Sequence, residues 1–286
     1  MKFAWIARHT HSFELAPMCR VLDVGLSGYH SWCQRDISPR QQRQQHLAVR
    51  VRAVHAEFRK VYGSPRVFKE LRSQGVPVCE NTVAKIMRQL GLRSKRVRKF
   101  VPHTTDSNHA HPVAANSLDR DFKALGPNQK WVTDITYIPT GAGWLYLAAV
   151  LDLYSRKVVG WSMQTHLRVE LVQDALRMAL ARRKPGAGLL HHSDRGVQYA
   201  CGEYRRLLEK HGIECSMSRT GNCYDNAAME SFWSTLKTEC VYHETYTTHA
   251  EARQSIFEFL EVFYNRVRSH SSIGYLSPEA FEAAAN

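Results

Sequence analysis

The chain has 286 residues, a length that suggests about two domains. Its hydrophobic content of 44%, with 10% aromatic residues, is sufficient for buried cores. The longest apolar run, Trp144 to Leu151, is much shorter than the roughly 18 residues of a membrane span. The apolar part of the N-terminus is too short for a signal peptide, so we expect a cytoplasmic protein.

The net charge of +13 is confined to one part of the chain. Residues 1–110 contain 20 Lys and Arg against 7 Asp and Glu, whereas residues 111–286 contain 19 of each kind. A solvated basic face would explain this imbalance. A segment that binds a polyanion explains it better, because the same segment contains two candidate helix-turn-helix motifs. The sequence therefore favours contact with nucleic acid through its first 110 residues.

The seven cysteines and the known catalytic motifs exclude several classes of site. No two cysteines have C-x-x-C spacing, which argues against a zinc knuckle or a redox motif. Their odd number and scattered positions favour reduced thiols. The chain lacks G-x-S-x-G, Walker and G-x-G-x-x-G motifs, so serine hydrolase, P-loop and dinucleotide-binding chemistry have no support.

Residues 1–46 are predicted to form an N-terminal helical region. A helix from Pro17, a turn at Gly25 to Gly28 and a second helix from Tyr29 to Arg35 make the first helix-turn-helix candidate. A plain helical hairpin would have the same pattern. Residues 36–46 are polar and rich in Gln, and they form either a linker or the exposed start of the next helix.

Residues 47–102 are predicted to form a helix-turn-helix DNA-binding domain. One helix starts at Leu47, Ser64 caps a second that ends near Gly75, and Asn81 caps a third. The third helix carries Lys85 and Arg88 beside its apolar stripe, where they could reach phosphates or base edges. A basic tail follows and suits a backbone clamp or a minor-groove arm. Its candidate DNA contacts are Arg93, Lys95, Arg96, Arg98 and Lys99.

Residues 103–120 are interpreted as an interdomain linker, after which strands alternate with helices. The nearly all-apolar segment Leu145 to Tyr154 is typical of a central strand covered on both faces. This pattern predicts a catalytic domain over residues 121–245 and a C-terminal helical extension over residues 246–286. The predicted strands are Lys130–Ile138, Leu145–Tyr154, Lys157–Gln164, Leu189–Ser193 and Ile213–Met217, and the predicted helices are Val169–Arg183, Tyr199–Gly212 and Asp225–Cys240.

Three acidic residues in distinctive contexts, Asp134, Asp194 and Glu230, are the candidate catalytic groups. Asp134 interrupts a β-branched strand, where Asp is unfavourable, and Asp194 follows a short strand at its C-terminal end. Helical spacing puts Glu230, Lys237 and Asn226 together at one edge of an apolar stripe. These side chains are therefore predicted to border a cleft.

Three carboxylates in one cleft would repel each other and raise their pKa values, and hard divalent cations remove that penalty. Ligation by oxygen alone selects Mg²⁺ or Mn²⁺ over zinc. Two such ions can activate an attacking oxygen and stabilise the leaving oxygen of a phosphoryl transfer. Two neighbouring acids receive structural roles: Asp152 follows an apolar strand without a motif, and Asp225 is predicted to cap the Glu230 helix.

The ordered contexts of these acids, with 35 residues between Asp194 and Glu230, resemble the catalytic triad of DDE transposases and retroviral-type integrases. The resemblance is strongest to OrfB-type transposases of bacterial insertion sequences and extends from about Tyr62 to Phe281. It implies an α/β ribonuclease-H-like core, a mixed five-stranded sheet with helices, preceded by an all-α helix-turn-helix region. The N-terminal His-His-Cys-Cys zinc module of retroviral integrases is expected to be absent.

The resemblance also implies an activity and its partners. The activity is metal-dependent cleavage of insertion-sequence ends and joining of their 3′-hydroxyls to target DNA, which constitutes transposition and DNA integration. The implied partners are the terminal repeats, the target DNA, further copies of the chain on DNA, and an OrfA-type protein or fusion. The expected location is the nucleoid, with no membrane partner.

The resemblance also points to further DNA contacts, but the motifs that indicate them are less specific than those of the acids. The family carries Lys or Arg at the position of Lys237, although a helix-surface lysine is usually only solvated. Arg266, Arg268 and His270 match the family's C-terminal pattern, but salt bridges to the domain's own acids are equally compatible with it. The adjacent His191 and His192 are interpreted as packing or hydrogen-bonding groups.

Two other functions share parts of this pattern. A ribonuclease-H-like nuclease would use the same acids but would give no joined DNA product. A DNA-binding regulator would keep the basic region without catalysis, and the intact acidic triad argues against it.

Overall fold

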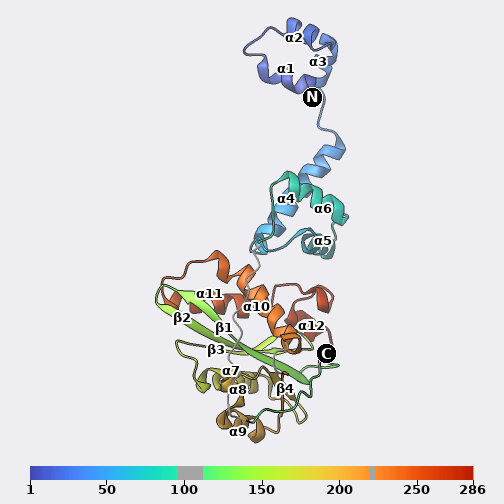
Figure 1. The fold of residues 1–286 in the computed structure, drawn as a ribbon. Coiled ribbons are helices and arrows are strands. Elements are labelled where there is room, and N and C mark those ends of the chain that lie inside the picture. The colour runs from blue at the N-terminus through green and yellow to red at the C-terminus, as the bar shows by residue number, and fades with distance from the viewer. Residues whose placement is uncertain (96–111, 220–222, 286) are drawn as a thin grey trace.

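The computed structural model describes residues 1–95, 112–219 and 223–285. Two helical units and an α/β domain follow one another along the chain (Figure 1). The first, the N-terminal unit, contains α1 (Lys2–His9), α2 (Leu15–Val21) and α3 (Leu26–Cys33). Helices α2 and α3 correspond to the predicted pair, but α3 begins at Leu26 with Gly25 in its cap position, so most of the predicted turn Gly25–Gly28 is helical. Helix α1 was not predicted, and it supplies Ile6 to a small core with Met18, Cys19 and Tyr29.

The second helical unit, residues 39–95, is called the middle unit below. It consists of α4 (Pro39–Glu57), α5 (Ser64–Ser73) and α6 (Glu80–Gln89). The polar residues 36–46 form the exposed start of α4, so the predicted boundary at 46/47 lies inside this helix. Ser38 and Gln41 exchange side-chain and backbone hydrogen bonds in a capping box, which fixes the start of α4.

Two predicted caps in the middle unit are displaced. Ser64 is the first residue of α5, with Gly63 in the cap position, and α6 begins at Glu80, one residue before the predicted cap Asn81. The apolar stripes nevertheless form the predicted core of the unit. Its buried residues include Val51, Val54, Val67, Leu71, Val83, Ile86 and Met87.

The α/β domain is built on a five-stranded mixed sheet with the strand order β3-β2-β1-β4-β5. Neighbouring strands β1–β2 and β2–β3 are antiparallel, whereas β1–β4 and β4–β5 are parallel. This is the mixed sheet that the sequence predicts. The strands are β1 (Lys130–Thr140), β2 (Gly143–Asp152), β3 (Val158–Gln164), β4 (Leu190–Ser193) and β5 (Glu214–Met217).

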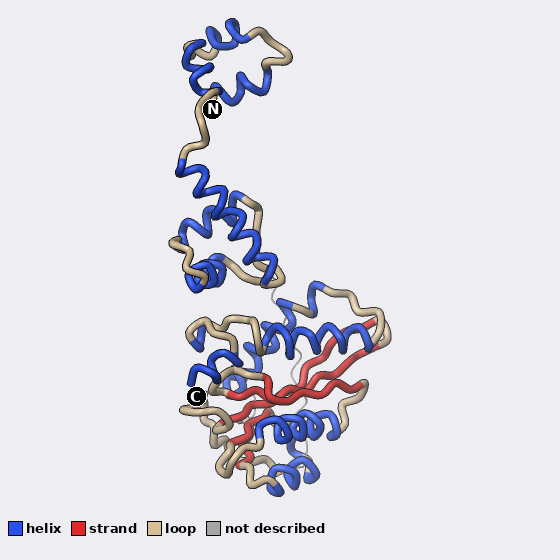
Figure 2. Tube along the Cα trace, turned by 180° about the vertical axis from the view of Figure 1, so that it is seen from behind, coloured by secondary structure: helices blue, strands red, loops and turns tan. Residues whose placement is uncertain are grey.

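Helices cover both faces of the sheet, as seen from opposite sides in Figures 1 and 2. Because successive side chains of β2 point to opposite faces, Leu147 and Ala149 belong to one core and Ala148 and Val150 to the other. Strand β2 is therefore apolar at almost every position. One face is covered by α7 (Val169–Arg183), α8 (Val197–Ala200) and α9 (Gly202–Lys210), and the other by α10 (Ala227–Glu239) and α11 (His249–Phe257).

Helix α7 packs very closely on β3. A side chain at Gly160 would place its Cβ 2.2 Å from the carbonyl oxygen of Ala175, so only glycine fits at this position. The predicted helix Tyr199–Gly212 is divided at Cys201 into α8 and α9.

The C-terminal extension wraps back over the domain. A 3-10 turn, η1 (Cys223–Asn226), precedes α10, and a second, η2 (Val241–His243), follows it. Helix α11 continues into a π-helical segment, η3 (Glu258–Tyr264), and the chain ends with η4 (Ser271–Ile273) and α12 (Pro278–Ala285). Among the described residues, no helix is both long and apolar enough to span a membrane.

Candidate active site

The sheet register brings Asp134 and Asp194 together. In the parallel pair β1–β4, Trp131 lies opposite His191 and Val132 opposite His192, an offset of 60 residues. Continued two residues past the last pair, this offset puts Asp194, the residue after β4, alongside Asp134 on β1, and the charge of Asp194 acts on Asp134. Asp194 Oδ1 accepts a hydrogen bond from the backbone N–H of Gly196 at 2.9 Å, which fixes its carboxylate at the strand end.

Helix α10 carries Glu230 to the same place. The Trp233 indole N–H donates to Asp134 Oδ2 at 2.9 Å, and the Asn226 amide donates to the carbonyl oxygen of Thr133 at 3.4 Å. Glu230 lies three residues before Trp233, one helical turn away, so these two contacts hold its helix turn against β1. Glu230 is exposed at the rim of the site, and Asp134 is half-buried.

The charges of the three acids interact. Burial raises the pKa of Asp134 to about 8, and the negative charges of Asp194 and Glu230 act in the same direction. The two hydrogen bonds to Asp134, from Trp233 and from the backbone N–H of Ile135, oppose the rise in pKa but do not cancel it. Burial also raises the pKa of Glu230. A cation at this site would relieve both effects.

The side chains fit a hard cation better than a soft one. All three acids offer oxygen ligands, which suit Mg²⁺ or Mn²⁺. The buried Asn226 Oδ1 is a further oxygen, and it has no hydrogen-bond partner among the described residues. Within the described ranges, however, no three His, Cys, Asp or Glu side chains already form a closed group around a cation position. Asp134 lies on β1, Asp194 directly follows the neighbouring strand β4, and Glu230 is exposed at the rim of the site.

Asp225 does not cap α10 as predicted. Its fully buried carboxylate accepts hydrogen bonds from the Arg219 guanidinium, at 3.1 Å, and from Arg120 Nε and Asn116 Nδ2, both at 3.0 Å. The cap position belongs to Asn226, without a side-chain capping bond. Hydrogen bonds from Arg219 hold the pKa of Asp225 well below its usual range. The prediction was wrong because these arginines attract the carboxylate more strongly than the helix terminus does.

The neighbouring residues with predicted structural roles are buried and hydrogen-bonded. His191 is hydrogen-bonded with Tyr204 at 2.7 Å, and His192 with Ser216 and Ser218. Burial lowers the pKa of His191 to about 3 and that of His192 to about 4, so both imidazoles are neutral near pH 7. Asp152 is fully buried and accepts from backbone N–H groups beside an ion pair with Arg183.

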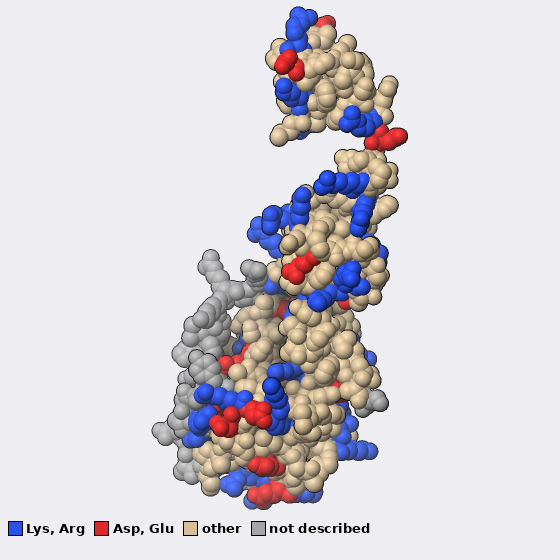
Figure 3. Space-filling model, turned by 90° about the vertical axis from the view of Figure 1, so that its right-hand side faces the viewer, with Lys and Arg blue, Asp and Glu red and all other residues tan. Residues whose placement is uncertain are grey.

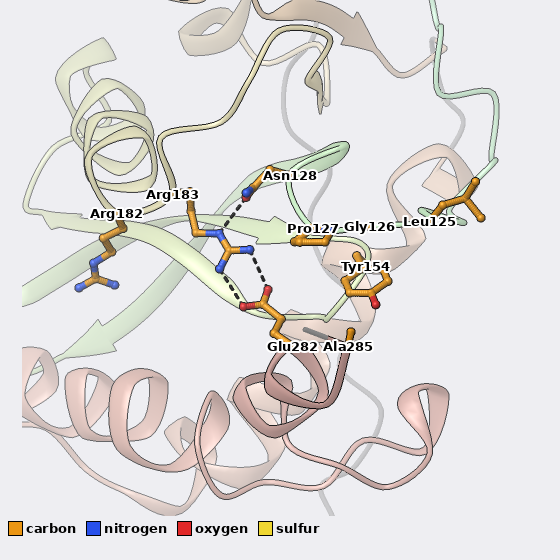
Figure 4. A pocket seen from close by; sticks show the side chains of 9 residues that line it. All are labelled: Leu125, Gly126, Pro127, Asn128, Tyr154, Arg182, Arg183, Glu282 and Ala285. Atoms are coloured by element: carbon orange, nitrogen blue, oxygen red, sulfur yellow. Dashed lines mark hydrogen bonds and ion pairs between the residues drawn. The ribbon is translucent and has the colours of Figure 1, made fainter.

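A cavity of about 340 Å³ beside Asp152 is structural in character (Figure 4). None of the three candidate catalytic acids lines it. Arg183 crosses the cavity wall, donating to Asn128 at 2.8 Å and pairing with both carboxylate oxygens of Glu282. These contacts tie α12 to the edge of the sheet, so the cavity walls are held by the fold's own ion pair.

The candidate DNA contacts of the middle unit are mostly exposed. Residues 39–95 contain 13 Lys and Arg against 3 Asp and Glu, whereas residues 1–38 contain 4 against 3, so the basic excess belongs to the middle unit (Figure 3). Lys85 and Arg88 on α6 and the following Arg93 are exposed. Lys95 is half-buried and donates to the backbone oxygen of Glu239 at 3.5 Å. Three predicted contacts, Arg96, Arg98 and Lys99, lie outside the described residues.

The candidates near the catalytic acids differ from one another. Lys237 is half-buried on α10, where burial lowers its pKa and the charge of Asp134 opposes that shift, so the two groups are close. Arg266 is exposed and pairs with Glu279 at 3.5 Å. Arg268 lies inside the domain. Its guanidinium is buried and bonded through two nitrogens to Glu239, both at 2.7 Å, so the alternative of an internal salt bridge holds.

Family comparisons cover most of the chain. Residues 124–223 and residues 211–278 each match a family described as Integrase core domain. Residues 41–100 match the family described as HTH-like domain. The matched range covers the middle unit from its third residue onward.

The transposase InsF for insertion sequence IS3A of Escherichia coli K12 is 48% identical over 284 residues, covering 99% of this chain and 98% of the relative. An uncharacterized 31 kDa protein of insertion element IS600 from Shigella sonnei is 46% identical over 264 residues, 92% of this chain and 97% of its own. The catalytic core of HTLV-2 integrase in complex with magnesium shares 13% identity, with a TM-score of 0.44 over 56% of this chain and 99% of that one. The chain therefore belongs to the IS3 family of insertion-sequence transposases and contains their integrase core domain.

Proposed function

We propose that this transposase cleaves the ends of its own insertion sequence and joins their 3′-hydroxyls to target DNA by metal-dependent phosphoryl transfer. Asp134, Asp194 and Glu230 are the proposed catalytic residues and metal ligands. The observation that carries the proposal is the placement of Asp134 on β1 and of Asp194 directly after the neighbouring strand β4, together with the Trp233 bond that fixes the helix of Glu230 to Asp134.

The proposed site divides its work among a few side chains. Two Mg²⁺ or Mn²⁺ ions, when bound, would stabilise charge on the attacking and leaving oxygens. Asp134 is oriented by two uncharged donors, Trp233 and the Ile135 backbone, so its negative charge stays available to a cation. Asp194 is held in place by the backbone of Gly196. Lys237, close to Asp134 and half-buried, would bind the DNA phosphate next to the scissile bond.

DNA recognition is assigned to the middle unit. Exposed Lys85 and Arg88 on α6 are the proposed contacts to the terminal repeats, and Arg93 and the basic residues after it would bind the backbone. Several copies of the chain would act together on two DNA ends, with an OrfA-type partner or fusion adding to end recognition. This activity would take place on cytoplasmic DNA in the nucleoid.

The test uses duplexes that carry the ends of the insertion sequence encoding this chain. Asp134→Asn, Asp194→Asn and Glu230→Gln should each abolish cleavage and joining in Mg²⁺, while binding to the same duplex stays within about twofold of wild type. The binding should survive because the basic residues of the middle unit are unchanged. Glu203→Gln, at an exposed acid on α9, is the matched control and should retain full activity.

Different outcomes separate the alternatives. Wild-type cleavage by any of the three variants would remove that acid from the proposed triad. Cleavage by the wild-type protein without joined products would favour a nuclease. DNA binding without metal-dependent cleavage would favour a regulator that has lost activity.

A further inference from the structure

The middle unit is attached to the catalytic helix through a buried ionic contact. Glu239, the last residue of α10, is buried and receives two hydrogen bonds from Arg268, both at 2.7 Å. Arg66 on α5 approaches the same carboxylate, with its Nη1 at 3.4 Å from Oε1. The side chain of Arg66 is only 25% exposed. A residue of the middle unit thus supplies a second guanidinium to the carboxylate at the end of the helix that carries Glu230.

Further contacts surround this ion pair. The fully buried Tyr62 accepts a hydrogen bond from the backbone N–H of Ser269 at 2.7 Å through its hydroxyl. The Arg59 guanidinium lies 5.0 Å from the centre of the Phe263 ring. The buried residues of the middle unit and of one sheet face also form a single continuous core. The contact is therefore specific in its polar groups and closed to solvent at its centre.

The docking contact and the predicted DNA-reading surface use different helices. Arg66 and Lys69 of α5 face the catalytic domain, where Lys69 lies 5.2 Å from the centre of the Tyr275 ring. The exposed Lys85 and Arg88 belong to α6. The middle unit can thus bind DNA through α6 while it remains attached through α5.

A buried ion pair is weak support for stability as such, but it is well suited to fixing one relative orientation of two elements. A shift of the middle unit would take the Arg66 guanidinium, which is three-quarters buried, away from the Glu239 carboxylate, while Glu239 would keep its pair with Arg268. The loss of this partner would act against neighbouring orientations of the middle unit. The contact thus restrains the angle between the middle unit and α10.

We infer that the Arg66–Glu239 contact sets the distance between the DNA sequence read by the middle unit and the phosphodiester presented to the catalytic acids. Arg66 is a positioning residue that selects which phosphate is cut. This inference rests on the proposed function, because it takes α6 to read the terminal repeat. Binding energy from the repeat would then be used to orient the scissile bond.

The experiment compares full-length Arg66→Met and Arg66→Lys with wild type on end-bearing duplexes in Mg²⁺. Three quantities are measured: DNA affinity, cleavage rate, and the cut position at nucleotide resolution. Arg66→Met should bind DNA within about twofold of wild type, since α6 is unchanged. Cleavage at the correct phosphate should fall on the order of 10- to 100-fold, because small misplacements of reacting groups have effects of that size. Cuts should spread to neighbouring phosphates, and Arg66→Lys should restore their position.

Two further variants make the result decisive. Arg72→Met removes an exposed arginine from the same helix and should leave the cut position unchanged. Tyr62→Phe removes the hydroxyl bonded to Ser269 with little change in shape and should spread the cuts as Arg66→Met does. Its result decides the matter if Arg66→Met does not fold. The inference is overturned if Arg66→Met and Tyr62→Phe, the two docking variants, both cut the correct phosphate at the wild-type rate. It is also overturned if their cleavage falls only in proportion to a loss of DNA affinity.

The proposed function fails in a different way. If Lys85→Ala and Arg88→Ala bind the end duplex like wild type, α6 does not read DNA, whatever the docking variants do. Metal-dependent nicking of unrelated duplex DNA should be lost in Asp134→Asn and kept in Arg66→Met. That contrast separates a fault in the catalytic acids from a fault in positioning.

Discussion

Asp134 and Asp225 both lie beside the N-terminal part of α10, but their surroundings have opposite effects. Asp225 is enclosed by Arg219, Arg120 and Asn116, and the arginine contacts lower its pKa. Asp134 receives hydrogen bonds from an indole and a backbone N–H, while nearby acids and burial raise its pKa to about 8. The charge of Asp225 is balanced within the protein, whereas ionisation of Asp134 is unfavourable unless a cation compensates it.

This difference distinguishes a structural acid from a functional one. A raised pKa costs stability at neutral pH, because the folded state must either take up a proton that the unfolded chain does not bind or hold a charge in an unfavourable place. Such a cost is typical of sites that act on an external ligand, whereas arginine-paired acids serve the fold. The same contrast applies to Glu239, which is paired with Arg268.

Asp134→Asn should abolish cleavage while leaving the metal-free protein as stable as wild type or more stable. The substitution removes a charge that the folded state disfavours. Mg²⁺ should raise the melting temperature of wild type, since a ligand that binds only the folded state adds about 2.7 kcal/mol at 100 times its Kd. The variant should show little of this rise. Thermal melts with Mg²⁺ and with EDTA measure it, and an equal rise in the variant would place the cation elsewhere.

Asp225→Asn should have the reverse profile. It leaves Arg219 and Arg120 without their shared carboxylate and should lower the free energy of unfolding by about 2–3 kcal/mol. Because both arginines are partly exposed and can be rehydrated, we expect a loss at the lower end of this range. Urea denaturation measures it. Mg²⁺ should still raise the melting temperature of the variant, and loss of that rise would mean that Asp225 belongs to the metal site.

The two acids should also give opposite pH dependences of stability. The folded pKa of Asp134 is raised from 3.8 to about 8, so its contribution to stability is complete below pH 3.8 and is lost as pH rises toward 8. The folded pKa of Asp225 is lowered, so its contribution is present above pH 3.8 and is lost as pH falls further.

Melts in EDTA between pH 5 and 8 therefore test Asp134. As the pH rises through this range, the free energy of unfolding of wild type should fall relative to that of Asp134→Asn by up to about 1.4 kcal/mol per pH unit. Taking the difference removes the opposite contribution of His191 and His192, whose pKa values are lowered by burial in both proteins. A difference that stays constant over this range would show that Asp134 is ionised throughout without penalty.

Lys237 offers a smaller test of the same site, because it is a cation near Asp134 that is proposed to bind DNA. Lys237→Ala should lower cleavage of the true end by about 1–2 kcal/mol, or roughly tenfold, through loss of a phosphate contact. The rise in melting temperature with Mg²⁺ should remain, and Lys237→Arg should keep more activity than Lys237→Ala. Cleavage of the true end at the wild-type rate by Lys237→Ala would mean that the lysine is only solvated.

The sequence predicted elements with strong periodicity and failed where distant partners decide the outcome. Helix α7 has the predicted bounds Val169–Arg183, because its apolar spacing is sustained over four turns. Asp225 was assigned to helix capping, a local role, but one of its arginines, Arg120, is 105 residues away in the sequence. Arg268 was a candidate for DNA because a basic residue shows its charge in the sequence but not its burial against Glu239.

The contacts around the acids were also beyond a reading of the sequence. The offset between β1 and β4 that brings Asp194 alongside Asp134 depends on which strands become neighbours in the sheet, and these two strands are 60 residues apart in the sequence. Trp233 was assigned only to the apolar stripe of its helix. Its indole N–H gave one signal in retrospect, because a buried tryptophan usually finds an acceptor.

Removing that indole N–H should have the smallest effect, and it tests whether the hydrogen bond to Asp134 contributes to the difference between Asp134 and Asp225. Trp233→Phe keeps an aromatic ring against β1 but removes the donor to Asp134 Oδ2. A group that orients a metal ligand commonly changes metal affinity by 10- to 100-fold, so the Mg²⁺ concentration for half-maximal cleavage should rise about tenfold. Trp161→Phe is the matched control, because the Trp161 indole donates to a different carboxylate, Glu261, at 2.6 Å. Both variants should lose about 1 kcal/mol of stability, but only Trp233→Phe should shift the Mg²⁺ dependence. An equal Mg²⁺ dependence in the two variants would mean that Trp233 serves Asp134 only as packing, and that the contrast with Asp225 arises from burial and charge alone.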